Sequence, residues 1–269
     1  MLINDIDSFN PVHIFECGQC FRWNCDKNGV YTGVSGGRVC RVDKKNIIFD
    51  DKDNDYWRNY FALDTDYSSI KKELLCMDKK IANCVEYGSG IRILKQDLWE
   101  TIVSFIISAN NNIPRIKRII ETMCTMFGNR IAMEEEELFS FPTPDVIAKL
   151  SKDDLAPLKV GYRDTYILDA AQKITSGEVD IDVLPKLSDI DAKDELMKIK
   201  GVGSKVADCI LLFALGRFSV FPTDVWIKRI LSNVYNVPDK EIQNFVNQKY
   251  KSLAGYAQQY LYYFYRNNM

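Results

Sequence analysis

The sequence has very little histidine and no long apolar run. Its 269 residues contain one histidine, His13, which excludes Ser–His–Asp triads and paired-histidine zinc sites. Chemistry must therefore rest on lysine, carboxylates, cysteine or tyrosine. No stretch of 18 or more apolar residues occurs, so no transmembrane helix is expected. The first 15 residues lack the basic head and apolar core of a secretory signal, and we expect an intracellular protein, cytoplasmic or nucleoid-associated if bacterial.

Cysteine is present but arranged without the spacing of a metal site. The eight cysteines are scattered, and none follows Cys209. In a chain of this kind they are expected to be free thiols. Cys17 and Cys20 form one C-x-x-C without a second pair or a nearby histidine, so packing in a strand is preferred over a zinc site. We expect no bound metal and no cofactor.

The net charge of −2 argues, taken alone, against a nucleic-acid binder. Its distribution matters more, because the segment Leu196–Ser232 holds six basic and only two acidic residues. Glu134–Glu137 form an acidic run elsewhere. The pattern is compatible with one cationic face on an otherwise acidic protein. The basic residues of the segment are Lys198, Lys200, Lys205, Arg217, Lys228 and Arg229.

The chain divides into a β-rich part and a helical part. Residues 1–95 alternate in polarity and carry two hairpin signals, Asn28-Gly29 and Gly36-Gly37, before a helical pattern from Trp57 to Lys80. From Leu98 onward almost every pattern is helical. We expect an α+β protein in which a β-rich domain over residues 1–95, a twisted antiparallel sheet with helices, precedes a mainly α-helical domain over residues 96–269.

The helical part contains a helix–hairpin–helix pattern in the stretch LMKIKGVGSKVADCILLFAL. A short helix ends before Gly201, and a longer one runs from Ser204 to about Gly216. Gly201 and Gly203 allow a tight turn whose amides, with the positive end of the second helix, can bind a phosphate. Lys205 stands at the start of that helix.

Asp224 follows in PTDV, where a further helix is expected to begin. Alone, Lys205 is compatible with a solvated or phosphate-binding lysine, and Asp224 with a helix N-cap. A lysine is nucleophilic only when neutral, and its free pKa is about 10.4. Burial and the helix N-terminus lower that pKa, whereas an ionised Asp224 nearby raises it. The sequence leaves the balance open.

The pairing of GVGSKVADC with PTDV resembles the helix–hairpin–helix–GPD superfamily of DNA base-excision glycosylases. The absence of cysteine after Asp224 removes the four-cysteine iron–sulfur loop of the endonuclease III relatives. GQCFRW (18–23), YFALDTDYSSI (60–70) and the stretch from Gly90 to Ile116 resemble the 8-oxoguanine DNA glycosylases in particular. The resemblance spans roughly residues 12–265.

This resemblance implies an N-glycosylase with abasic-site lyase activity. Lys205 would form a Schiff base with the sugar, Asp224 would be the essential acid, and the partner would be double-stranded DNA containing oxidised guanine. We expect a monomer without a membrane contact. The hairpin carbonyls of this superfamily can hold a cation, but the chemistry needs no metal. The alternatives are a glycosylase for another damaged base and a non-catalytic helix–hairpin–helix DNA-binding module.

The resemblance also implies a pocket for the flipped base. The Gly18 carbonyl would bind the N7 hydrogen of the lesion, next to Gln19 of the same motif, and Gln258 would read the pairing edge. Cys209 and Tyr262 would sandwich the base. The alternative for Cys209 is a core thiol, and Tyr260 or Tyr262 can equally be core aromatics.

The family fills the gap left in the duplex with an asparagine turn and a Tyr-Arg pair. Those positions are Asn110, Arg115, Tyr162 and Arg163, although Tyr162-Arg163 can also be an ordinary helix start. The DNA contacts implied by the resemblance further include Gly201, Gly203 and position 226. Trp226 replaces a phosphate-binding histidine of animal members, and Tyr262 replaces a common phenylalanine. Either change can alter affinity or strictness for the opposite base.

Overall fold

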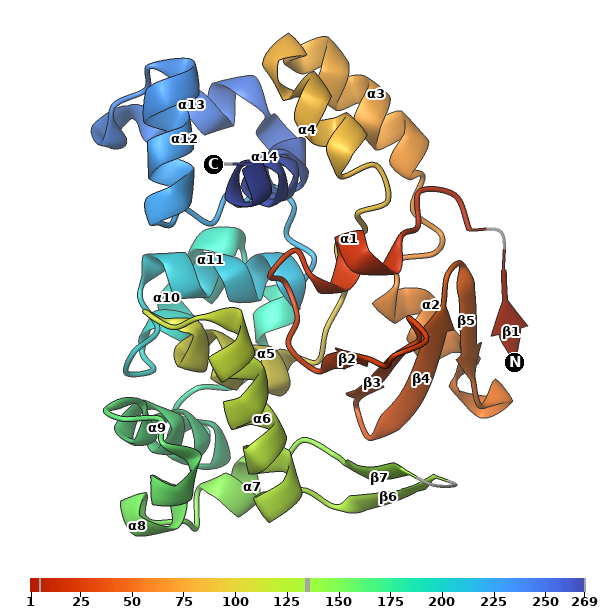
Figure 1. Cartoon of the computed structure of the whole chain (residues 1–269). Coiled ribbons are helices and arrows are strands. Elements are labelled where there is room, and N and C mark those ends of the chain that lie inside the picture. Colours follow the sequence, from red (N-terminus) through yellow and green to blue (C-terminus); the bar gives the residue numbers. More distant parts are fainter. Residues whose placement is uncertain (5, 134–135, 269) are drawn as a thin grey trace.

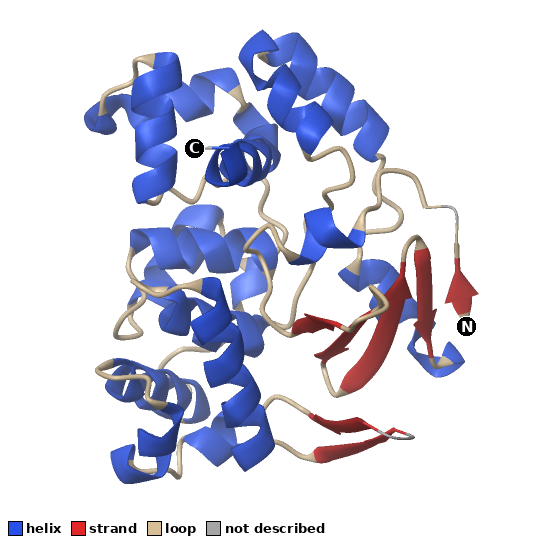
Figure 2. Cartoon of the chain, in the orientation of Figure 1, coloured by secondary structure: helices blue, strands red, loops and turns tan. Residues whose placement is uncertain are grey.

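A computed structural model describes residues 1–4, 6–133 and 136–268, and it has the expected α+β architecture (Figure 1). Red strands gather in the N-terminal part, and helices make up most of the remainder (Figure 2). None of the helices in these residues is long and apolar enough to cross a membrane.

The N-terminal sheet is antiparallel and has the order β1-β5-β4-β3-β2. Both predicted hairpins are confirmed: Gly29 has a φ of 85°, and Gly36 and Gly37 have φ values of 56° and 73°. Two successive positive φ values suit the two-residue turn that matches the twist of paired strands. The edge strand β1 is a short addition that the sequence pattern did not indicate. The strands are β1 (Leu2–Ile3), β2 (Trp23–Cys25), β3 (Tyr31–Ser35), β4 (Arg38–Asp43) and β5 (Asn46–Phe49).

An aromatic core covers one face of this sheet and anchors the loop after α1 (Pro11–Phe15). The Trp23 ring stacks on Phe15 with centroids 4.0 Å apart, and its indole N–H donates to the Tyr60 hydroxyl at 2.9 Å. Gly33 lies opposite Trp23 in the sheet, and a Cβ there would stand 2.4 Å from the indole. The packed indole fixes one end of the loop that carries Gly18.

The predicted helix from Trp57 to Lys80 is two helices, α2 (Asn54–Tyr60) and α3 (Tyr67–Met77). The chain breaks because Ala62 has a φ of 49° and Asp66 caps the next helix by accepting from the Ser69 amide. The other helices are α4 (Ala82–Tyr87), α5 (Leu98–Ser108), α6 (Ile113–Phe127), α7 (Pro144–Ile147), α8 (Lys152–Leu155), α9 (Arg163–Thr175), α10 (Asp189–Met197), α11 (Ser204–Phe213), α12 (Val225–Tyr235), α13 (Ile242–Lys249) and α14 (Ala254–Asn268).

The expectation of almost continuous helix after Leu98 was wrong at one place. β6 (Arg130–Met133) and β7 (Glu136–Phe139) form a separate antiparallel pair after α6. Strong charge in this stretch hides the alternation that marks a strand. The acidic run of residues 134–137 lies partly outside the described residues.

The segment 88–97 crosses from the sheet to the helices and ties both together. The Lys95 amide donates to the Tyr60 carbonyl, and the Gln96 amide donates to the Phe213 carbonyl, each at 2.9 Å. α3 and α4 share the larger hydrophobic cluster with α14 and other helices of the second half. The division after residue 95 stays a prediction about the sequence, because the packing runs across it.

Candidate active site

The helix–hairpin–helix consists of α10, α11 and the turn between them. Gly201 has a φ of 85°, which favours glycine, and Gly203 is the N-cap of α11 without a side-chain cap. The exposed amides at this helix start are available to an anion. The predicted hairpin is confirmed, but α11 ends at Phe213 because the chain turns towards Gly216, whose φ is 64°.

Side chains of α9 hold the hairpin in place. Asp169 accepts from the Lys200 amide at 2.8 Å, and the Lys173 ammonium donates to the Lys198 carbonyl at 2.6 Å. The Tyr166 ring packs on Gly201, where an added Cβ would stand 2.3 Å from Cδ2. The turn is therefore a rigid platform.

We expect Gly201→Ala to lower the free energy of unfolding by about 1–3 kcal/mol, because the alanine meets both an unfavourable φ and the Tyr166 ring. Gly203→Ala is the matched control, since Gly203 has a φ of −90° and an added Cβ meets no atom within 4 Å. Its change should stay within about 0.5 kcal/mol. Urea unfolding of both variants measures the difference, and equal losses would contradict the packing argument.

The cationic face expected from residues 196–232 is partly neutralised, which corrects the charge argument. Four of its basic residues form ion pairs with acids that lie outside that window of sequence. The pairs are Lys198–Glu195 at 2.6 Å, Lys200–Asp169 at 3.4 Å, Arg217–Asp189 at 3.5 Å and Lys228–Asp239 at 2.7 Å.

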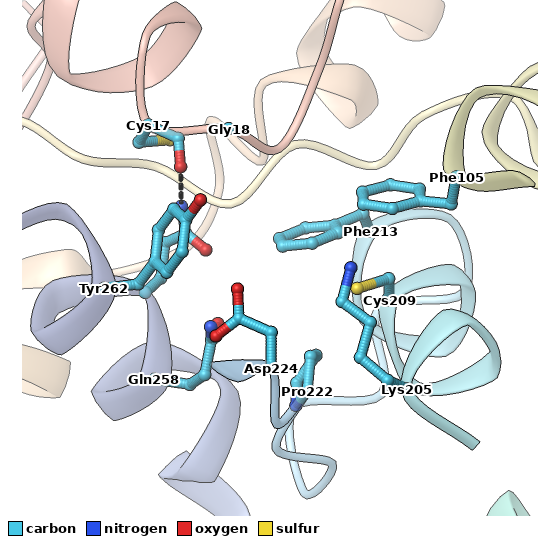
Figure 3. A pocket seen from close by; sticks show the side chains of 11 residues that line it. Cys17, Gly18, Phe105, Lys205, Cys209, Phe213, Pro222, Asp224, Gln258 and Tyr262 are labelled. Atoms are coloured by element: carbon cyan, nitrogen blue, oxygen red, sulfur yellow. Dashed lines mark hydrogen bonds between the residues drawn. The ribbon is translucent and has the colours of Figure 1, made fainter. Parts of the chain in front are cut away.

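Lys205 and Asp224 line one pocket although they come from different helices (Figure 3). Lys205 lies in the first turn of α11. Asp224 is the N-cap of α12, and its Oδ1 accepts from the Ile227 amide at 2.9 Å, so the predicted cap is confirmed. One carboxylate oxygen is thereby held by the helix, which fixes the direction in which the carboxylate points.

The surroundings of Lys205 answer the question that the sequence left open. Burial of the amine disfavours its ammonium form, whereas the Cys209 sulfur and the Asp224 carboxylate favour it, and the balance raises the pKa of Lys205 above its usual value. The amine also lies 5.4 Å from the centre of the Phe105 ring, a cation–π contact. The resting lysine is therefore an ammonium, and it would have to lose a proton before it could act as a nucleophile.

Three side chains around the pocket could hold a flat polar molecule. The Gln258 amide oxygen is buried and has no hydrogen-bond partner among the described residues. Tyr262 lies one helical turn further along α14, and the Cys209 sulfur faces it across the pocket (Figure 3). Burial raises the pKa of Cys209 to about 11, so it is a neutral thiol near pH 7. An unpaired buried amide oxygen is costly, and a ligand that donates a hydrogen bond to it would remove that cost.

Gly18 lies at the pocket wall with a φ of 83°, and a Cβ there would stand 3.3 Å from the Tyr262 ring. Gln19 does not share this position. Its side chain is fully buried, donates to the Ile14 and Arg92 carbonyls at 2.9 and 2.8 Å, and accepts from the Leu94 amide at 2.9 Å. We therefore correct its assignment: Gln19 fixes the Gly18 loop and does not contact a base.

The two cysteines on either side of Gln19 pack in the core and do not bind a metal. The Cys17 thiol donates to the Ile14 carbonyl at 3.2 Å, and Cys17 and Cys20 are both buried and free. Across the described residues no group of His, Cys, Asp and Glu side chains could hold a metal ion.

The pocket, about 40 Å³ in volume, opens onto a wider hollow of about 640 Å³. Lys205, Asp224 and Tyr262 line both. Asn110, whose φ is 50°, and the exposed Trp226 line the outer part of the hollow. Lys205 and Asp224 thus lie where the small pocket meets a wider open groove.

The remaining predicted DNA contacts lie at the turn between α5 and α6. Arg163 is only 5% exposed and donates to the Val160 carbonyl at 3.1 Å as well as to the carbonyls of Ala109 and Asn110. Arg115 donates to the Lys159 carbonyl at 2.9 Å. Both arginines therefore hold backbone here, and their contact with an opposite base stays a prediction. Tyr162 precedes α9 and is 54% exposed, free to contact a partner.

Sequence reasoning missed several pocket residues. Phe105 and Phe213 stack with centroids 5.5 Å apart behind Lys205, and Gln259 donates to the Cys17 carbonyl at 2.9 Å. Phenylalanines in apolar helices look like ordinary core, and no local signal separates them from it. The neighbouring glutamine Gln258 was the one hint that α14 carries a buried polar site.

Comparison with known proteins assigns the family. The model of the 8-oxoguanine DNA glycosylase N-terminal domain matches residues 1–102, and that of the HhH-GPD superfamily base excision DNA repair protein matches residues 103–260. The chain belongs to the 8-oxoguanine DNA glycosylase family of this superfamily. The expected resemblance is confirmed.

Individual relatives agree over nearly the whole chain. The N-glycosylase/DNA lyase of Saccharomyces cerevisiae is 30% identical and covers 90% of this chain, which spans 72% of it. Among solved structures, MBOgg1 in complex with a low affinity DNA ligand is 43% identical with a TM-score of 0.94, covering 99% of this chain and 95% of its own. The Clostridium acetobutylicum 8-oxoguanine glycosylase/lyase bound to double-stranded DNA with cytosine opposite 8-oxoG is 37% identical, with a TM-score of 0.92 and coverage of 100% and 98%.

Proposed function

We propose that this chain removes 8-oxoguanine from double-stranded DNA and then nicks the strand, with Lys205 as nucleophile and Asp224 as the essential carboxylate. The observation that carries this is the shared pocket of Lys205, Asp224 and the unpaired Gln258 amide at the bottom of a groove. Amine, carboxylate and base-reading amide are the groups that a glycosylase with lyase activity needs. The family and its relatives support this function.

The reaction follows from the groups in the pocket. The neutral Lys205 amine forms a bond to C1′ of the sugar while the bond to the base breaks, and the base leaves with that electron pair and takes up a proton. The cationic charge that develops on the sugar is stabilised by Asp224. Opening of the sugar ring gives an imine, with O4′ becoming a hydroxyl. The imine acidifies the C2′ hydrogen, and its loss expels the 3′ phosphate.

We expect kcat/KM for nicking of a preformed abasic site to rise about tenfold per pH unit from about pH 6 to 8. The reason is that the raised pKa of Lys205 leaves only a small fraction of neutral amine in the free enzyme, and that fraction grows as the pH rises. Single-turnover gels across this range measure the slope. A flat profile would contradict the ammonium resting state.

Lesion recognition uses the opposite side of the pocket. A base inside the duplex is out of reach, so it must be flipped out at a cost of a few kcal/mol. Gly18 supports a carbonyl contact to the N7 hydrogen, because its missing side chain permits close approach. Gln258 would read the pairing edge, while Cys209 and Tyr262 would enclose the base from its two faces.

DNA would lie along the groove. The amides at Gly201 and Gly203 can hold a phosphate, and Trp226 lines the groove where animal members have a phosphate-binding histidine. Asn110 and Tyr162 are exposed and would lie near the orphaned base. Arg115 and Arg163 would reach that base only after their hydrogen bonds to backbone carbonyls break. The monomeric state stays a prediction.

Borohydride trapping with damaged duplexes tests this function against its alternatives. We expect a covalent adduct and cleavage with 8-oxoguanine, compared across the four opposite bases. An adduct formed preferentially with an alkylated base or uracil would instead indicate another glycosylase of the superfamily. DNA binding with neither adduct nor cleavage would indicate a non-catalytic module.

A further inference from the structure

Arg266 lies one turn beyond Tyr262 on α14, and none of the roles described so far uses it. Its guanidinium carbon is 5.9 Å from the centre of the Tyr262 ring, and the guanidinium also interacts with the Tyr262 hydroxyl. Nη1 itself is buried and has no hydrogen-bond partner among the described residues. A buried charged donor without an acceptor is costly, and it suggests that an acceptor arrives from outside.

This unpaired nitrogen lies beside Gly18. A Cβ built on Gly18 would stand 3.6 Å from Arg266 Nη1 and 3.7 Å from the Tyr262 hydroxyl oxygen. The tyrosine hydroxyl and the arginine therefore lie next to Gly18, at the corner of the base pocket that Gly18 and Tyr262 line. Figure 3 shows Tyr262 and Gly18 at this corner, on the side of the pocket away from Lys205.

The chemistry of the lesion supplies an acceptor at that corner. 8-Oxoguanine differs from guanine at two adjacent positions, because it carries a hydrogen on N7 and a carbonyl oxygen on C8. If the Gly18 carbonyl accepts from N7–H, the C8 oxygen must lie next to Gly18 as well. That oxygen needs a donor, and neither the Gly18 carbonyl nor the Gln258 amide, which faces the pairing edge, supplies one.

We propose that Arg266 is a specificity-determining residue that donates a hydrogen bond from Nη1 to the C8 oxygen of the flipped lesion. This rests on the proposed 8-oxoguanine activity. Guanine presents a C8–H at the same place, so it would leave the buried Nη1 of Arg266 unpaired. A site built to bond a polar group rejects the analogue that lacks it, because its own polar group then stays unsatisfied.

A substrate cycle tests the contact. 8-Thioguanine keeps the N7 hydrogen but replaces the C8 oxygen by sulfur, a weaker acceptor. Single-turnover excision of both bases is measured for the parent protein and Arg266→Met. We expect the substitution to slow 8-oxoguanine excision by about 10- to 100-fold and to slow 8-thioguanine excision much less. The parent protein's preference for oxygen over sulfur should therefore shrink, and the larger size of sulfur cancels because it affects both proteins.

Two variants separate direct from indirect action. Tyr262→Phe removes only the hydroxyl partner of Arg266, and the oxygen-over-sulfur preference should survive it. Arg58→Met removes an exposed arginine that pairs with Asp64, and it controls for loss of a guanidinium elsewhere in the chain.

Equal losses on both substrates in Arg266→Met would overturn the proposal and leave Arg266 as a support for Tyr262. Collapse of the preference in Tyr262→Phe would overturn it too, because the contact would then run through the hydroxyl. If the parent protein nicks abasic DNA but excises neither base, the proposed substrate is wrong and the Arg266 contact falls with it.

Discussion

Replacing Lys205 by glutamine is expected to abolish borohydride trapping and to slow 8-oxoguanine excision by roughly 10³-fold or more. An amide nitrogen cannot attack C1′, whereas the glutamine side chain can still pack against Phe105 and Phe213. The groove and hairpin should therefore still bind DNA. Single-turnover cleavage, adduct gels and a binding titration with the same duplex measure the three quantities separately.

Lys152→Gln provides the matched control for this prediction, because Lys152 is an exposed residue at the start of α8, outside both hollows. It should trap and cleave like the parent protein. A covalent adduct that persists in Lys205→Gln would show that another amine is the nucleophile.

Asp224→Asn is expected to slow base excision by roughly 10²- to 10³-fold while the protein stays folded. Asparagine keeps an oxygen that can accept from the Ile227 amide, so the N-cap of α12 survives. The charge that stabilises the cationic sugar is lost. The same loss removes one of the groups that raise the pKa of Lys205, so the pH profile of abasic-site nicking should move to lower pH.

Comparison with Asp224→Ala separates charge from capping. Alanine removes the carboxylate and also the cap, at a cost of about 1 kcal/mol in stability, whereas asparagine removes only the charge. Excision rates at several pH values and urea unfolding of both variants give the two contributions. Unchanged excision in Asp224→Asn would rule out an electrostatic role for this residue.

The opposing effects on Lys205 explain why two separate measurements are needed. In the proposed mechanism Asp224 stabilises positive charge on the sugar, yet it also raises the pKa of Lys205, the amine proposed to attack. An assay starting from the damaged base reports both effects together. An assay that starts from an abasic site omits cleavage of the bond to the base, so its rate reports mainly the protonation state of the Lys205 amine.

Local sequence signals predicted the features that depend on short-range geometry. Gly201 predicted the hairpin turn, because its φ of 85° is one that favours glycine. Asp224 predicted the start of a helix, because aspartate is a common N-cap residue. Gly36-Gly37 gave the tight turn for the same local reason. The resemblance of GVGSKVADC and PTDV to a known superfamily indicated the family, which the comparisons confirm.

Long-range contacts were beyond the reach of the sequence. Gln19 follows Gly18 directly, but its amide nitrogen already donates to the carbonyls of Ile14 and Arg92. It is therefore not available to hydrogen-bond a base. Four of the six basic residues in the hairpin segment pair with acids elsewhere in the chain, such as Asp169. Neither result follows from residue type or spacing, because both depend on which segments that are distant in the sequence pack next to each other in the fold.

The sequence by itself determined the α+β class, the hairpin, and the lysine and aspartate on which the proposed chemistry depends. Only the tertiary structure decided the charge state of Lys205, since burial and Asp224 act on its pKa in opposite directions and their balance depends on packing. The tertiary structure alone also brought Arg266 beside Gly18, across almost the full length of the chain. Side-chain chemistry is local, but desolvation and unpaired polar atoms are properties of the folded packing.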